Sequence, residues 1–381
     1  MRRRRRFWRS SHARHTVPVQ AHRELSSGGF VRVSESERKR GTRKAYPPAD
    51  RVPIGYYELS THLLALEALR RGYQLEWFHR SMFRARSGAT RFAFWCTRCT
   101  MISSVAAKAT IRKDVAARIL AADGLSIARG RTFKVASADK ARRYASRQLP
   151  RPLVVKPADE AKGRGITVDL TESAEFVRAW DLAVSTGTKL VRVERMFAGS
   201  EARFLVVDGV THAAVSRLPP NVVGDGTSTV RELIEAKNAA RKGNPHLKSR
   251  PILLDPHRLS VLARAGYNLT SVLPDGERVF VDVKGNFSTG ADSIDVTDTV
   301  HPGFLEAAAA AAKAFPGLGI AGVDIIAQDF AEPATPDNYI VVELNSMPAI
   351  GAHHFPGVGA SRNVAVPIID FAERNAATSP A

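Results

Sequence analysis

Three residues near the C-terminus have the types and spacing of a site for a divalent cation. Within residues 341–348, Glu343 and Asn345 are two positions apart, so on an extended strand their side chains point to the same face. Asp324 lies in an earlier apolar stretch, residues 322–326, that could pair with this strand. Two carboxylates and an amide oxygen are too few to enclose Ca²⁺ but suit Mg²⁺, which keeps water ligands and shares substrate phosphates. A polar strand face turned to solvent is the alternative for these residues alone.

A basic segment with two glycines has the composition of a phosphate-binding loop. Lys156 ends a short apolar strand, and a second apolar strand begins at Ile166. Between them, Gly163 and Gly165 permit sharp turns that bring backbone N–H groups toward an anion, and Arg164 adds positive charge. The chain has no G-x-x-x-x-G-K-[ST] pattern, so this is not a Walker loop. A two-glycine hairpin without a ligand is the alternative.

Two further strands indicate a hinge that could hold a base. Residues 191–197 and 201–207 are apolar strands separated by a glycine turn, an arrangement in which adenine could lie between two layers. Arg217 ends the strand that follows. A solvated strand edge is the alternative for each charged residue here.

Taken in order, these motifs resemble the ATP-grasp ligases. The resemblance extends from about Ala106 to Phe371, and it is strongest to the ATP-grasp region of cyanophycin synthetase and of the fused glutamate–cysteine ligase/glutathione synthetases. The phrases that carry it are KDVAARIL from Lys113, VKP at 155–157, GRGIT at 163–167, VER at 193–195, GSEAR at 199–203, GDG at 224–226, VRELI at 230–234, NFSTG at 286–290, DVTD at 295–298, GVD at 322–324 and ELNSMP at 343–348. Each phrase is common by itself; their order is what indicates the family.

The resemblance implies a role for each matched residue. The implied nucleotide-binding residues are Lys113, Lys156, Gly163, Arg164, Gly165, Glu194, Arg195, Phe197 and Glu201. The implied magnesium ligands are Asp324, Glu343 and Asn345, and the implied catalytic residues are Arg203, Arg217 and Asn286. In this scheme the lysines contact phosphate, residues 194–197 form the adenine hinge, and Glu201 binds the ribose hydroxyls. The implied cofactors are ATP and Mg²⁺, with two ions expected and Mn²⁺ as an alternative.

The implied reaction is the formation of an amide between a carboxylate and an amine, through an acyl phosphate and with release of ADP. The expected partners are a small-molecule or short-peptide carboxylate and an amine acceptor. A thiol or hydroxyl acceptor, a catalytically silent ATP-grasp scaffold, and a nucleic-acid-associated protein that uses an arginine-rich tail are the alternatives. Asp282 and Ala291 depart from the family pattern near Asn286, and both departures concern substrate contacts. With no Walker loop and no Mur-ligase-like half, a complete cyanophycin synthetase is not expected.

The resemblance also implies the fold, an α+β ATP-grasp architecture in which two lobes sandwich ATP. The expected units are a basic tail at 1–47, a small N-terminal α/β lobe at 48–104, a central lobe at 105–195 and a C-terminal lobe with the metal site at 196–381. Hydrophobic spacing and capping residues predict helices at 58–71, 113–123, 137–149, 171–185, 228–241, 256–265, 302–314 and 364–374.

Charge is distributed unevenly along the chain. The net charge is +19, and residues 1–46 hold 14 Lys/Arg against 3 Asp/Glu, a net +11 that leaves +8 for the rest. A polar, aperiodic and self-repelling tail of this kind is predicted to be disordered. No apolar run is long enough for a membrane span, and the two cysteines fit a reducing, cytoplasmic location. Nucleic-acid binding is not expected, because basic and aromatic residues do not alternate outside the tail. The sequence leaves open whether the chain forms a homo-oligomer.

Deletion of residues 1–46 is expected to leave ATP-dependent turnover unchanged, since every implied site residue lies beyond Ala106. Phosphate release by the full chain and by the truncated chain, compared at equal concentration, tests this. A large loss of turnover in the truncated chain would show that the tail belongs to the site.

Overall fold

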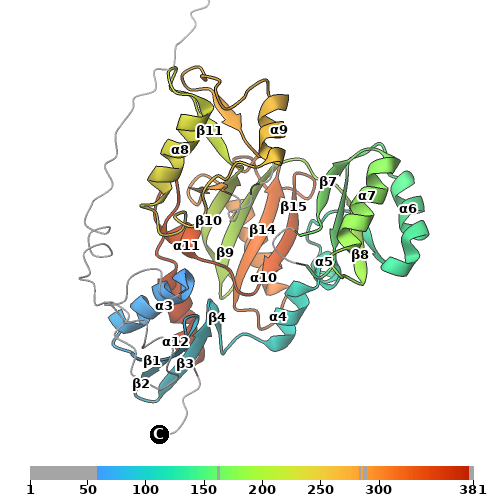
Figure 1. Cartoon of the computed structure of the whole chain (residues 1–381). Helices are drawn as coiled ribbons and strands as arrows, with labels where there is room; N and C mark the ends of the chain where they lie inside the picture. Colours follow the sequence, from blue (N-terminus) through green and yellow to red (C-terminus); the bar gives the residue numbers. More distant parts are fainter. Residues whose placement is uncertain (1–57, 161–163, 283–284, 286–289, 377–381) are drawn as a thin grey trace, which may run out of the picture.

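The computed structural model describes residues 58–160, 164–282, 285 and 290–376. These residues form three larger sheets and one two-stranded sheet, with helices packed on them (Figure 1). The expected mixture of helices and strands, α+β, is confirmed. The tail at residues 1–47 lies outside the described residues. None of the helices within the described ranges is both long and apolar enough to span a membrane.

The first unit is an antiparallel sheet covered by helices from both ends of the chain. Its strands, in the order β1-β2-β3-β4, are β1 (Gln74–His79), β2 (Met82–Ser87), β3 (Thr90–Trp95) and β4 (Arg98–Cys99). Phe83 and Phe94 point inward by strand alternation and pack with α3 (Leu59–Arg70) and α12 (Ala365–Asn375). Arg71 ties α3 to α12 through Asp370, at 2.6 Å, and Glu373, at 2.7 Å.

The second unit is a four-stranded sheet that carries the implied hinge and the glycine loop. Its strands, in the order β5-β8-β6-β7, are β5 (Gly130–Lys134), β6 (Leu153–Pro157), β7 (Thr167–Leu170) and β8 (Leu190–Arg195). Helices α6 (Ala138–Ser146) and α7 (Ser173–Val184) cover it, with the short 3₁₀ turn η2 (Val135–Ser137) before α6. This unit lies to one side of the large sheet (Figure 1).

The third and largest sheet forms the centre of the molecule (Figure 1). Its strands, in the order β13-β10-β9-β14-β15, are β9 (Ser200–Val207), β10 (Val210–Leu218), β13 (Asp292–Asp295), β14 (Ile320–Ala327) and β15 (Tyr339–Asn345). One face packs on α10 (Pro302–Lys313), where Phe204 meets Phe304 in a common core, and the other face meets α12. Two helices that precede the second unit, α4 (Ser104–Ile111) and α5 (Lys113–Ala122), pack on β15.

A smaller unit is inserted between β10 and β13. It consists of β11 (Asn221–Val223), α8 (Val230–Arg241), α9 (Pro256–Arg264) and β12 (Arg278–Phe280), with an apolar core of its own. The short helix α11 (Gly351–His354) follows β15.

All eight helices predicted from spacing are present, each with ends within three residues of the predicted ones. The helices α4 and α11 and the strands β4, β5, β11, β12 and β13 were not predicted. They are short, and most lack the apolar periodicity on which such predictions rest. The lobe boundaries at 104/105 and 195/196 stay predictions.

Replacement of Phe204 by alanine is expected to destabilise the protein by about 3–5 kcal/mol, because the ring is fully buried between the large sheet and α10. Val210→Ala, at an exposed position of β10, is the matched control and should change stability by less than about 1 kcal/mol. Urea unfolding followed by fluorescence measures both; equal midpoints would contradict the assigned core.

Candidate functional site

The three implied metal ligands lie together at the edge of the large sheet. Strands β14 and β15 are antiparallel with Asp324 opposite Glu343 and Gly322 opposite Asn345. The amide of Asn345 donates to Glu343 Oε1 at 3.5 Å. The juxtaposition expected from spacing is therefore present, whereas the role of these residues as ligands stays a prediction.

Asp324 is buried and is held by two arginines, one on the adjacent strand β9 and one on β10, the strand beyond it. Arg203 on β9 lies directly opposite Asp324 and donates to both carboxylate oxygens, at 2.6 Å each. Arg217 on β10 adds longer contacts of 3.2 and 3.4 Å. Burial pushes the pKa of Asp324 upward, but the charges of Arg203 and Arg217 outweigh it and hold the pKa below its ordinary value. Asp324 is therefore ionised in the folded protein.

Glu201 belongs to the same cluster. Its carboxylate accepts a 2.6 Å hydrogen bond from Arg217 Nη1. Burial raises the pKa of Glu201 to about 7, and the positive charge of Arg217 offsets this only in part. The resemblance assigns Glu201 to the ribose, while in this structure it orients Arg217.

A second cluster of charges is buried in the sheet of the second unit. Glu194 on β8 forms ion pairs with Lys156 on β6 and with Arg192, whose Nε lies 2.5 Å from Glu194 Oε2. Burial pushes the pKa of Glu194 upward, but Lys156 and Arg192 lower it by more. Lys156 and Glu194 thus contact each other directly, a link that the motif order did not indicate.

Lys113, at the start of α5, lines a pocket together with Glu343 and with residues of the second cluster. Its Nζ lies 3.8 Å from Glu343 Oε2, and it also donates to the carbonyl of Glu160. Burial lowers the pKa of Lys113, although Glu343 acts in the opposite direction. A pocket opens between the second unit and β15; it is lined by Thr110, Lys113, Ala116, Ala117, Leu120, Ile127, Ala128, Lys156, Arg192, Glu194, Val341, Val342 and Glu343. Lys113, Lys156 and the carboxylate of Glu343, a predicted metal ligand, therefore share a pocket whose remaining wall is largely apolar.

The other predicted site residues are more dispersed. Arg164 is mostly exposed and pairs with Glu160 at 3.2 Å, and Arg195 donates to the side chain of Gln148 at 2.9 Å. Gly165 adopts a positive φ of 67°, and a Cβ there would lie 2.6 Å from Thr186. The remaining nucleotide candidate in this region, Phe197, is half-buried. Gly163 and Asn286 lie outside the described residues.

Two residues near the site were not predicted to contribute to it. Arg192 lines the pocket and pairs with Glu194; their i, i+2 spacing on one strand face was the available signal. Asp282, which departs from the family pattern, is buried and pairs with Arg258 on α9 at 3.1 Å. The negative charge of Asp282 is therefore balanced by Arg258, a residue of the inserted unit.

The oxygen ligands that the protein offers fit a magnesium ion whose other ligands come from the nucleotide and from water. Across the described residues, no group of three His, Cys, Asp or Glu side chains is placed to hold a metal. Glu343 is one-third exposed at the pocket and Asn345 is beside it, whereas both oxygens of Asp324 already accept from Arg203. Glu343 and Asn345 would provide the accessible protein oxygens, which suits Mg²⁺ because its other ligands are usually water and phosphate.

Comparison with known proteins identifies relatives of this arrangement. No family model matches the chain. Cyanophycin synthetase from Synechocystis sp. is 40% identical over 223 residues, covering 58% of this chain and 25% of the relative. The glutathione biosynthesis bifunctional protein of Clostridium perfringens is 30% identical over 327 residues, covering 84% of this chain and 42% of the relative.

A solved structure shows the same fold. The bifunctional glutathione synthetase from Pasteurella multocida superposes with a TM-score of 0.65 at 28% identity, covering 84% of this chain and 44% of that one. The chain thus spans between a quarter and under half of the length of these three relatives. ATP-grasp ligases in general use ATP and Mg²⁺. The resemblance in the motifs is confirmed: the chain has the ATP-grasp fold and is similar to the matching parts of cyanophycin synthetase and the bifunctional glutathione proteins.

Proposed function

We propose that the chain is an ATP-dependent carboxylate–amine ligase that forms a peptide-like amide. One pocket carries this proposal. It is lined by Lys113 and Lys156, which come from different elements, and by Glu343 on β15, the strand that bears the predicted metal ligands Glu343 and Asn345. Two lysine side chains beside a strand face with oxygen ligands suit a nucleoside triphosphate bound with magnesium. The relatives named as synthetases have activities of this kind, and an amide product is carried over from them as part of the proposal.

In the proposed reaction, a substrate carboxylate oxygen attacks the γ-phosphorus of ATP, and the bond from that phosphorus to the β,γ-bridging oxygen breaks to release ADP. An amine then attacks the carbonyl carbon of the acyl phosphate, inorganic phosphate leaves, and the amine loses a proton. Phosphoryl transfer needs little covalent help from the protein, so positioning and charge neutralisation dominate. Bound Mg²⁺, as two ions or with Mn²⁺ as a substitute, would neutralise phosphate charge and orient the γ-phosphoryl group.

The chain's own residues have distinct proposed tasks. Lys113 and Lys156 bind phosphate oxygens from two sides of the pocket, and Glu343 with Asn345 holds the metal. Arg217, aligned by Glu201, and Arg203, aligned by Asp324, provide fixed positive charge beside the metal ligands. Charges that are already fixed by ion pairs stabilise a transition state without reorganising. The loop that contains Arg164 and Gly165 would exclude water from the acyl phosphate.

A catalytically silent scaffold is the competing proposal. It is disfavoured because Lys113, Lys156, Asp324, Glu343 and Asn345 are all present, and the structure brings both lysines to the pocket that Glu343 also lines.

Glu343→Ala is expected to lower ATP-dependent phosphate release at least about 100-fold, because it removes the accessible carboxylate of the metal face. The measurement is phosphate release from Mg·ATP across a panel of amino-acid pairs, with product masses. Glu332→Ala, at an exposed position that does not line the pocket, is the matched control. A Glu343→Ala enzyme that turns over at the wild-type rate rules out the metal assignment.

Lys156→Met is expected to weaken Mg·ATP binding at least about tenfold, as expected for loss of a charge-assisted hydrogen bond to phosphate. Calorimetric titration with Mg·ADP and Mg·ATP measures the effect. Glu194 keeps Arg192 as a partner in this variant, so the fold should survive. Lys140→Met, on the exposed side of α6, should bind like the wild type, and a Lys156→Met variant that does the same would contradict the phosphate role.

A further inference from the structure

The outward face of the first sheet carries aromatic side chains that remain exposed. Alternation along β1, β2 and β3 places Trp77, Phe83 and Phe94 on the inward face, where they pack with α3 and α12. On the opposite face, Phe78 is 51% exposed and Trp95 is 49% exposed. Large apolar side chains that gather on a protein surface mark a site of interaction with a partner.

The register of the strands places these side chains next to one another. His79 on β1 lies opposite Met82 on β2, and Met82 lies opposite Trp95 on β3. The rings of His79 and Trp95 stack, with an interplanar angle of 6° and 5.2 Å between their centroids. The guanidinium of Arg84 lies over the ring of Phe78, 5.3 Å from its centroid. A strip of aromatic and apolar side chains therefore crosses the three strands.

Two arginines on the same face lie directly opposite each other. Arg86 on β2 pairs with Arg91 on β3 in the strand register, and both side chains are exposed. Within the described ranges no carboxylate lies at ion-pair distance from either, whereas Arg84 pairs with Glu76. Like charges directly opposite each other on neighbouring strands destabilise the pair. An anion bound between the two guanidinium groups removes this cost.

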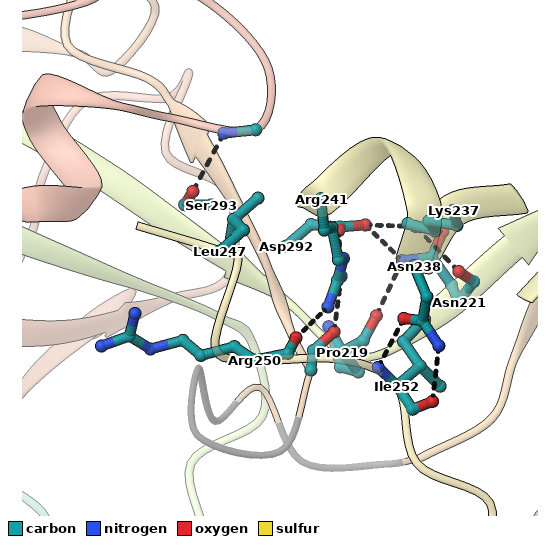
Figure 2. A network of polar contacts seen from close by, with 12 residues as sticks. Pro219, Asn221, Lys237, Asn238, Arg241, Leu247, Arg250, Ile252, Asp292 and Ser293 are labelled. Carbon is teal, nitrogen blue, oxygen red and sulfur yellow. Dashed lines mark hydrogen bonds and ion pairs between the residues drawn. The ribbon is translucent and has the colours of Figure 1, made fainter. Parts of the chain in front are cut away.

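Basic side chains that stabilise the fold have a different environment. In the inserted unit, Arg241 and Lys237 on α8 each donate to Asp292 at 2.6 Å (Figure 2). Arg241 also donates to the carbonyl of Arg250 at 2.7 Å. The chain itself compensates these charges. The opposed arginines of the first sheet have no such partner among the residues that the structure describes, so they are available to a ligand.

The basic tail joins the described part of the chain at the rim of this face. The N–H of Glu58, the first described residue, donates at 2.9 Å to the carbonyl of Arg80, in the turn between β1 and β2. Residues 1–46 hold 14 Lys/Arg against 3 Asp/Glu, a net charge of +11. The tail and the face thus carry charge of the same sign. The tail therefore does not complement the face, whereas a polyanion complements both.

The aromatic strip distinguishes among polyanions. Nucleic acids, acidic proteins and anionic membranes all carry negative charge, but only nucleic acids combine regularly spaced phosphates with flat bases that stack on aromatic rings. The bases of a duplex are already stacked inside it, so a surface of this kind suits a single strand. The order of residues along the chain does not predict this binding, because it does not show which side chains share one face of the sheet.

We propose that the outward face of β1, β2 and β3 binds single-stranded nucleic acid, DNA or RNA. Bases stack on Trp95 and Phe78, and phosphates lie between Arg86 and Arg91. The tail adds an attraction that depends on charge alone and weakens with salt. This face is separate from the nucleotide pocket, whose lining residues all lie outside the first sheet, so the proposal does not rest on the ligase activity.

Fluorescence anisotropy with the full chain tests the aromatic part of the face. The probes are a labelled oligodeoxythymidylate and an oligouridylate of about 16 nucleotides, each compared with an abasic strand of the same length and charge. At least one base-bearing strand is expected to bind at least about tenfold more tightly than its abasic counterpart. Trp95→Ala should remove most of this difference, and Trp95→Phe should keep most of it because a phenyl ring also stacks. Phe280→Ala, at an exposed ring of the inserted unit, is the matched control.

The salt dependence of binding tests the charged part of the face. The double variant Arg86→Gln/Arg91→Gln should reduce the slope of log affinity against log salt concentration by about 1.4, since each phosphate contact on a single strand contributes about 0.7. Arg231→Gln, at an exposed position of α8, should leave the slope unchanged. Melting temperatures show that each variant is folded, and phosphate release from Mg·ATP should be the same in all of them.

The proposal is wrong if the wild type binds base-bearing and abasic strands equally, which is the behaviour expected of the charged tail alone. It is also wrong if Trp95→Ala retains the full preference or if the double variant retains the full slope. Vesicles of phosphatidylcholine and phosphatidylserine, and polyglutamate, should bind without dependence on Trp95. A larger loss for either of these than for the oligonucleotides assigns the face to a membrane or to an acidic protein and overturns the proposal.

Discussion

The buried carboxylate of Asp324 is the constraint on which the site depends. It is 1% exposed in the middle of a sheet, and an ionised group so placed must be compensated by hydrogen bonds and opposite charge. Arg203 and Arg217 supply both, from the two strands on one side of Asp324, so three adjacent strands are held in one register. Loss of one partner from such a buried pair typically costs about 3–5 kcal/mol. The arrangement fixes the position of the arginines as firmly as it fixes Asp324.

The second unit contains a similar buried carboxylate, Glu194, whose charge is compensated by Lys156 and Arg192. Lys113, on α5, belongs to neither cluster; its Nζ lies 3.8 Å from Glu343 Oε2, and it lines the same pocket as Lys156 and Glu194. A nucleotide in this pocket would therefore meet charges from both the large sheet and the second unit, each already held by its own ion pairs.

Strand alternation accounts for what could be predicted of this site from the sequence. Glu343, Asn345 and Asp324 belong to apolar strands whose period of two places them on one face, and antiparallel pairing brings Asp324 opposite Glu343. The ion-pair partners could not be predicted in this way. Arg203 and Asp324 are 121 positions apart, and Arg217 and Asp324 are 107 apart, so only the packing of the sheet brings them together. Likewise, β13 carries Asp292 in a polar stretch without an apolar alternation that would mark a strand.

The paired arginines connect the stability of the fold with the arrangement of the site. Where a guanidinium fixes the fold, as Arg241 does with Asp292 or Arg71 with Asp370, the carboxylate comes from the chain itself, and the pair is complete before any ligand binds. Arg203 and Arg217 combine both tasks, because Asp324 fixes them while Arg203 also lies 3.9 Å from Glu343. Their positive charge is therefore held beside the predicted metal ligands by the same ion pairs that hold the sheet together.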